Sequence, residues 1–149
     1  MGRKQVKDIV PGRDLKYYSE YVTSIENYAS ACGITIKYDN MDGEGSYEPH
    51  KRWLRISPDL SQSCEIAVLL HELGHCLDDT LVSKKMEPKL SKAYNAIYKD
   101  KYTKTQLALV VACERRAWKM GRAVAKKLRI RLGKWYDEIQ RFCIEDYKN

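Results

Sequence analysis

Long apolar runs are missing from this chain. The longest, LALVVAC at 107–113, has seven residues, whereas a membrane-spanning helix needs about 20. No apolar run follows the basic N-terminal segment MGRKQVKDIVPG, so the sequence does not predict a secretory signal. N-terminal myristoylation is not expected either, because Val6 occupies a position where the signal requires Ser or Thr. These absences predict a protein without a membrane partner.

Paired cysteines are also missing. The five cysteines, at positions 32, 64, 76, 113 and 143, form no Cys-x-x-Cys pair, and their odd number rules out a complete set of disulfides. Such a pattern is typical of proteins from a reducing compartment. The sequence therefore predicts a cytoplasmic protein.

The composition is that of one ordinary globular domain. Of 149 residues, 44% are hydrophobic and 32% are charged, and no repeat or low-complexity segment occurs. We expect a single domain over residues 1–149, with 1–12 as a flexible leader. The formal charge of +7 favours anionic partners but does not identify a function.

Hydrophobic periodicity predicts a mostly helical α+β domain with a small antiparallel sheet beside its central helix. Asp14 is the expected N-cap of the first helix and Gly33 its stop. Strands are expected at 34–39 and within 46–57, paired back on each other across the NMDGEG turn, with Pro49 at the start or edge of the second. Asp59 and Gln62 resemble a capping box. The expected helices are 14–32, 59–82, 87–102, 105–130 and 134–148.

Histidine is scarce, yet two of the three histidines lie four residues apart in LLHELGHCLDD, at 69–79. On a helix, residues i and i+4 share a face, so His71 and His75 can bind one metal ion. Glu72 lies about 100° round the helix from His71, beside the metal, where it can act as a base. Residues 66–70 are apolar on every face, and unpaired imidazoles would be costly in such a helix. This is the His-Glu-x-x-His motif of metal hydrolases.

A catalytic zinc site needs a third protein ligand and an open fourth position. No histidine follows His75, and the best carboxylate is Glu114. Its neighbours at helical spacing are all apolar or small, and a carboxylate on such a face is costly unless it is paired or binds a metal. A buried ion pair with an arginine is the alternative for Glu114. Asp78 and His50 are the next candidate ligands, although His50 is more typical of a surface residue.

Several nearby residues receive secondary predictions. Asp78 shares the histidine face and would either orient an imidazole or face solvent. Cys76 and Cys113 are expected in the core, and Gly74 is expected to allow close helix packing. Four tyrosines could stabilise an oxyanion, and the sequence does not rank them. They are Tyr94, Tyr98, Tyr102 and Tyr136.

HELGH on a hydrophobic helix, followed by CERRAW at 113–118, resembles the zincin-type metallopeptidases of the gluzincin kind. The chain looks most like the small ImmA/IrrE-like domains and the HExxH proteins of phages and bacteria, over roughly residues 33–122. Their pattern usually has an acidic or small residue where Trp118 stands. The resemblance implies a minimal zincin-like fold with zinc bound by His71, His75 and Glu114. It also implies that Glu72 acts as general base and later as acid. If a phage encodes the protein, the expected location is the host cytoplasm.

The predicted function is zinc-dependent hydrolysis of peptide bonds in a protein substrate, with Glu72 activating a zinc-bound water. The segment HKRWLRIS at 50–57 could receive an extended substrate at a sheet edge. Two alternatives remain open. One is a catalytically silent zincin-like regulator, and the other is a nucleic-acid-binding protein that uses a basic cluster. The cluster consists of Lys126, Lys127, Arg129, Arg131 and Lys134.

Overall fold

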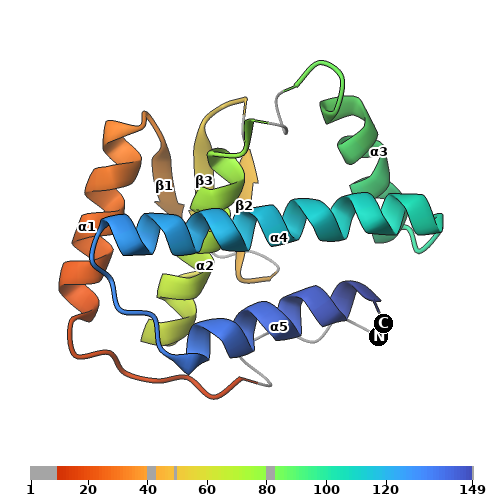
Figure 1. Ribbon diagram of the computed structural model, residues 1–149. Coiled ribbons are helices and arrows are strands. Elements are labelled where there is room, and N and C mark those ends of the chain that lie inside the picture. Colours follow the sequence, from red (N-terminus) through yellow and green to blue (C-terminus); the bar gives the residue numbers. More distant parts are fainter. Residues whose placement is uncertain (1–9, 40–42, 49, 80–82, 149) are drawn as a thin grey trace.

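The computed structural model describes residues 10–39, 43–48, 50–79 and 83–148. The described residues form five helices and three strands, which confirms the predicted mostly helical α+β class (Figure 1). No described helix is long and apolar enough to cross a membrane. In chain order the elements are α1 (Tyr18–Ala31), β1 (Thr35–Tyr38), β2 (Gly45–Glu48), β3 (Trp53–Ile56), α2 (Gln62–Cys76), α3 (Glu87–Tyr98), α4 (Lys104–Lys127) and α5 (Lys134–Lys148).

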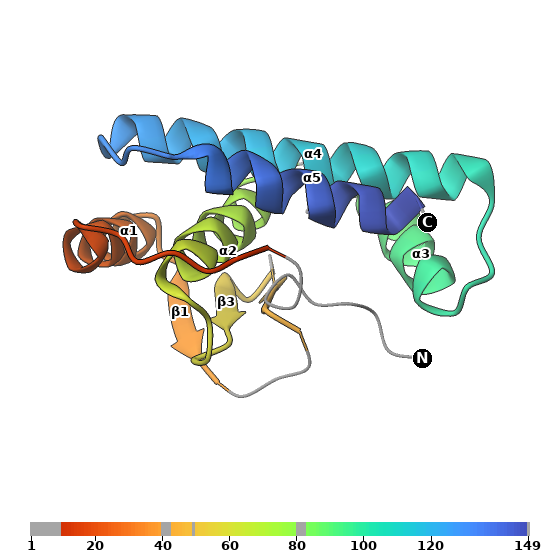
Figure 2. The same cartoon turned by 90° about the horizontal axis from the view of Figure 1, so that it is seen from below.

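Helix α2 lies at the centre of the fold. Helices α4 and α5 run antiparallel, side by side, and cover one side of α2, while the sheet lies on the other side (Figures 1 and 2). Helix α1 flanks α2 at one end of the molecule, and α3 packs against the start of α4 at the opposite end. Because α2 is enclosed in this way, 13 of its 15 residues are buried. The prediction of a central, buried motif helix is confirmed.

Two glycines let α2 and α4 approach closely. A Cβ atom at Gly74 would overlap the carbonyl oxygen of Ala117, and one at Gly121 would lie 2.7 Å from the carbonyl oxygen of Leu70. The absence of side chains at these two positions therefore allows the backbones of α2 and α4 to lie close together. The expected role of Gly74 in close packing is confirmed.

Replacing Gly74 by alanine is expected to destabilise the protein by about 1–3 kcal/mol or more, because the added methyl group meets backbone that cannot rotate away. Helix propensity alone predicts the opposite sign, since alanine is better than glycine in a helix by about 1 kcal/mol. Urea denaturation of the wild type and of Gly74→Ala distinguishes these outcomes. A variant as stable as the wild type, or more stable, would contradict the close approach.

The sheet differs from the prediction. Its order is β1-β3-β2, with β1 parallel to β3 and β2 antiparallel to β3. The predicted single strand within 46–57 is two strands, joined by a reversal in which Arg52 has a φ of 52°. Residues 50–57 therefore include the central strand, and the expectation that HKRWLRIS forms an exposed edge is wrong. Residues 40–42 of the predicted turn and Pro49 lie outside the described residues.

The ends of the first helix and of α2 also differ from prediction. Helix α1 begins at Tyr18, so Asp14 is not its N-cap, whereas Gly33 follows its end with a φ of 73° as expected. The hydroxyl of Ser61 caps α2 in place of Asp59. Local spacing suggested Asp59, but Ser61 is the residue with extended backbone directly before the first helical turn.

Long-range contacts at the start of α2 explain why its predicted capping box does not form. The side chain of Gln62 accepts a hydrogen bond from the amide of Leu15 at 2.7 Å, and Ser63 accepts one from Arg13 at 2.9 Å. Val10, which the sequence assigned to a flexible leader, is buried in the core, while residues 11 and 12 are exposed and 1–9 lie outside the described residues. Helices α2 and α3 end at Cys76 and Tyr98, four or more residues before their predicted ends.

Candidate metal centre

The predicted ligands meet where α2 crosses α4. His71 and His75 lie on the face of α2 that is turned toward α4, and both direct Nε2 at the same carboxylate oxygen of Glu114. The distances from Glu114 Oε2 are 3.0 Å to His71 Nε2 and 2.8 Å to His75 Nε2. One ligand atom from each residue lies within 4.8 Å of the other two. Tertiary folding therefore brings together residues that are 39 and 43 positions apart.

The geometry of these three residues fits a tetrahedral zinc ion. Ligand atoms about 2.0–2.1 Å from zinc lie about 3.3 Å from one another, a few tenths of an ångström more than the two distances to Glu114. Two imidazoles and one carboxylate are also a ligand set of catalytic zinc sites. The alternative partner, an arginine, is not observed, since no described arginine forms an ion pair with Glu114. Small movements of the Glu114 side chain would admit the ion.

Strong electrostatic coupling holds the three side chains together. Burial alone would raise the pKa of Glu114, but the imidazoles of His75 and His71 outweigh it and hold the pKa well below its usual range. Burial alone would lower the pKa of His75, whereas the Glu114 carboxylate raises it to about 10. The lowered pKa of Glu114 and the raised pKa of His75 both show that this environment favours an ionised carboxylate next to a positive charge.

Two aromatic rings fix the orientations of the imidazoles. The ring of Tyr47, from β2, stacks on His75 with centroids 4.2 Å apart and an interplanar angle of 12°. The ring of Trp118, from α4, stacks on His71 at 4.3 Å and 27°. The indole of Trp118 thus forms a wall of the site. The sequence did not identify Tyr47 as a site residue, because the alternation of a strand does not indicate which side chain of another element Tyr47 contacts.

Tyr147, near the end of α5, is a further residue of the site. Its hydroxyl donates a hydrogen bond of 2.6 Å to Glu114 Oε1, the oxygen that does not face the histidines. This contact orients the carboxylate so that Oε2 points at both imidazoles. Helical spacing places Tyr147 on the same stripe of α5 as the buried Tyr136, but that spacing does not show that the stripe reaches Glu114.

Replacing Tyr147 by phenylalanine is expected to weaken zinc binding about 10–100-fold, because groups that orient a metal ligand contribute on this scale. Competition with a chromophoric chelator measures the affinity. Tyr98→Phe is the control, since Tyr98 lies on α3, is 90% exposed and is not among the clustered ligand residues. Equal zinc affinity in Tyr147→Phe and the wild type would show that the hydrogen bond does not position Glu114.

Glu72 is poised beside the ligands without joining them. Its Oε1 lies 3.9 Å from His71 Nε2, and its Oε2 is buried with no hydrogen-bond partner among the described residues. Burial raises the pKa of Glu72, although His71 and His75 act in the opposite direction. A buried carboxylate oxygen without a partner is costly, which is typical of a group kept for chemistry.

Other predictions near the motif have mixed outcomes. Asp78 is buried and pairs with Arg116 of α4, so it does not face solvent. It orients neither imidazole: His71 Nδ1 has no hydrogen-bond partner among the described residues, and His75 Nδ1 lies 3.9 Å from Cys113 Sγ. Asp78 ties the end of α2 to α4, a long-range role that helix position alone could not reveal.

The remaining candidates separate by burial. Cys76 and Cys113 are buried as expected. Of the four tyrosines, Tyr98 and Tyr102 are exposed, and the buried Tyr136 donates its hydroxyl to the carbonyl of Trp118. Tyr94 remains near the site. His50, with 58% of its side chain exposed, lies 3.9 Å from Glu87 and outside the metal cluster, as expected for a surface histidine.

Comparisons of the chain with protein-family models, with curated proteins and with solved structures found no match. The resemblance to zincin-type metallopeptidases therefore stays a prediction from the motif.

Proposed function

We propose that this protein is a zinc-dependent peptidase. The observation that carries the proposal is the convergence of His71, His75 and Glu114 on one point, with the unpartnered carboxylate oxygen of Glu72 beside it. A purely structural zinc site usually has four protein ligands and needs no adjacent base. Three ligands and a base are the arrangement of a hydrolytic site.

A bound zinc ion and the protein side chains would have different roles in the reaction. A zinc ion held by these residues would polarise a substrate carbonyl and make water more acidic. Glu72 takes the proton of the attacking water and delivers it to the leaving amine, which makes it both base and acid. Tyr47 and Trp118 hold the ligand rings, and Tyr147 holds the ligand carboxylate.

Strand β2 is the better candidate for aligning an extended peptide, in place of the segment 50–57. It is an edge strand of the described sheet, because it pairs only with β3. Its Gly45 packs against Val68 and Glu72 of α2, since a Cβ atom there would be 2.7 Å from Val68 Cγ1 and 3.0 Å from Glu72 Cγ. A peptide paired with β2 would have its backbone next to the base.

Metal analysis and proteolysis together test this function. We expect the purified wild type to bind about one zinc ion per chain and to cleave casein, an unfolded substrate, while His71→Ala does neither. Chelation should abolish cleavage, and added zinc should restore it. A wild type that binds no zinc when zinc is supplied would contradict the proposal. Stoichiometric zinc without cleavage would favour the silent regulator.

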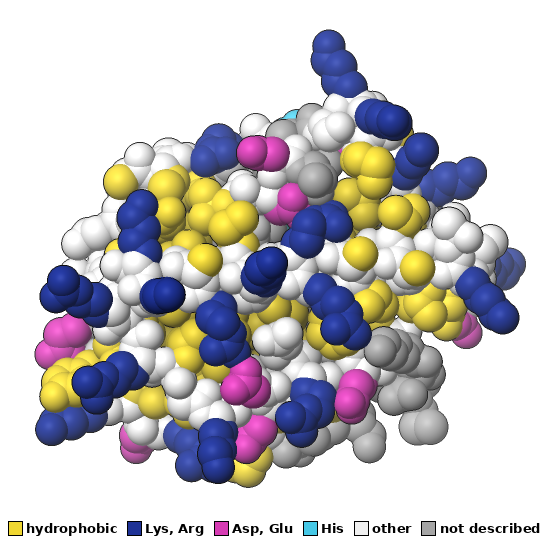
Figure 3. Space-filling model, viewed as in Figure 1, with side chains coloured by type: hydrophobic (Ala, Val, Ile, Leu, Met, Phe, Trp, Pro, Cys, Tyr) yellow, Lys and Arg dark blue, Asp and Glu magenta, His cyan; other side chains and the backbone are white. Residues whose placement is uncertain are grey.

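A basic surface supports nucleic-acid binding as a second candidate. Figure 3 shows lysine and arginine side chains along the exposed side of α4. The cluster at the end of α4 and the start of α5 is exposed, and none of its members forms an ion pair with a described carboxylate. Its members are Lys126, Lys127, Arg129, Arg131 and Lys134. Binding to duplex DNA that weakens steeply with salt and is unchanged in Glu72→Gln would support this function.

A further inference from the structure

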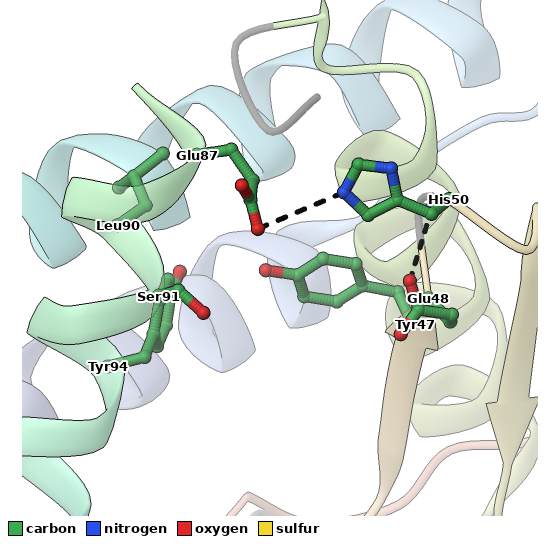
Figure 4. A pocket seen from close by; sticks show the side chains of 7 residues that line it. All are labelled: Tyr47, Glu48, His50, Glu87, Leu90, Ser91 and Tyr94. Carbon is green, nitrogen blue, oxygen red and sulfur yellow. Dashed lines mark hydrogen bonds and ion pairs between the residues drawn. The ribbon is translucent and has the colours of Figure 1, made fainter. Parts of the chain in front are cut away.

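A pocket of about 320 Å³ opens beside the metal centre, between β2 and the first turns of α3 (Figure 4). Its apolar wall is formed by Tyr47, Tyr94 and the buried Leu90. Figure 4 shows Tyr47 projecting across the pocket toward α3. Because the same Tyr47 ring stacks on His75, the pocket shares a wall with the metal site.

Two carboxylates are among the polar groups that line this pocket. Glu48 comes from the end of β2 and Glu87 from the start of α3, and both line the pocket. The residues that line the pocket include no lysine or arginine, although the chain as a whole carries a formal charge of +7. His50 bridges the rim: its backbone amide donates to Glu48 at 3.1 Å, and its ring lies 3.9 Å from Glu87. A negatively charged pocket on a positively charged protein attracts a cation.

The depth of the pocket also offers contacts for a long cationic side chain. The aromatic rings and Leu90 can pack against an aliphatic stem, and a tyrosine ring face attracts a cation. The hydroxyl of Tyr94 is buried with no hydrogen-bond partner among the described residues, so this wall also offers one polar atom to a bound ligand. Two carboxylates near the rim then balance the charge.

We infer that this pocket binds an arginine or lysine side chain of the substrate polypeptide, close to the bond that is cleaved. The inference rests on the proposed peptidase function and names its substrate class. The stem lies along Tyr47, Tyr94 and Leu90, and the charged group lies at the rim beside Glu48 and Glu87. The shared Tyr47 wall places the bound residue next to the zinc ligands.

Binding of matched peptides tests the inference without relying on hydrolysis. The probes are acetyl-Ala-Ala-Arg-Ala-Ala-amide and the same peptide with citrulline, the uncharged isostere of arginine. NMR titration of Glu72→Gln protein is expected to show at least about tenfold tighter binding of the arginine peptide. That preference should disappear in a protein that also carries Glu48→Gln and Glu87→Gln. Glutamine at position 48 keeps an oxygen that can accept the His50 hydrogen bond, so the rim should retain its shape.

The control is Glu20→Gln, which removes an exposed carboxylate from α1 at the opposite end of the molecule and should leave the preference intact. Equal binding of the two peptides, or no binding of the arginine peptide at millimolar concentration, would overturn the inference. A preference that survives the double substitution would overturn it too. In a second arm, cleavage sites of the wild type in casein should be enriched in adjacent basic residues. Binding with no cleavage by the wild type would contradict the peptidase function and leave the pocket assignment standing.

Discussion

Glu72→Gln is expected to reduce peptide hydrolysis about 10²–10⁴-fold, while zinc content and thermal stability change little. General acid–base catalysis contributes on this scale, and glutamine can neither accept the proton of water nor return it to the leaving amine. The amide has nearly the same size as the carboxylate, and Glu72 is not one of the three clustered ligand residues. The loss should therefore appear in kcat, with KM nearly unchanged. Initial rates on a fluorogenic peptide, with elemental analysis of the same sample, measure both quantities.

Glu65→Gln is the matched control for Glu72→Gln. Glu65 is also a buried glutamate of α2, but it lies near the start of the helix, where its carboxylate accepts a hydrogen bond from Tyr18. Glutamine can still accept this bond, so full activity is expected from the control. Hydrolysis by Glu72→Gln at the wild-type rate would show that another group activates the water and would contradict the role assigned to Glu72.

Glu114→Gln is expected to weaken zinc binding by more than the 10–100-fold typical of groups that only orient a ligand. The carboxylate supplies the one negative charge of the ligand set, and both imidazoles point at its Oε2. An amide oxygen is a weaker, uncharged donor, so the ion loses charge balance as well as a ligand. Competition with a chromophoric chelator gives the affinity.

Glu138→Gln, on α5 and outside the metal cluster, serves as the control for Glu114→Gln and should bind zinc like the wild type. Near-stoichiometric, tight zinc in Glu114→Gln would show that the third ligand is not this residue. Asp78 could not readily replace it, because its carboxylate is committed to Arg116. That result would reduce the centre to two histidines and argue against a catalytic zinc.

Local patterns were sufficient to predict the motif helix and the three candidate metal ligands. A spacing of four places two histidines on one face of any helix, whatever it packs against. The apolar residues on both sides of Glu114 likewise indicate a buried carboxylate that needs a partner. These are properties of a single helix, so they can be derived before the fold is known. In the structure these three residues, His71, His75 and Glu114, form one cluster, which the packing of α2 against α4 brings together.

The strand arrangement could not be derived in the same way. Alternation indicates that a segment is extended, but the reversal near Arg52 and the parallel pairing of β1 with β3 depend on which segments meet. The same limit applies to helix ends. The predicted capping box failed because Gln62 bonds to Leu15, a partner 47 positions away.

The sequence by itself determined the predominantly helical class, the buried motif helix and the chemical identity of the candidate metal ligands, because each follows from short-range spacing and side-chain chemistry. Only the tertiary structure decided that Tyr147 orients Glu114, that Tyr47 stacks on His75, and that two glutamates face each other across a pocket. These features join residues from different elements. Their contacts are set by the close packing of α2 with α4 and by the position of the sheet, which no local pattern encodes.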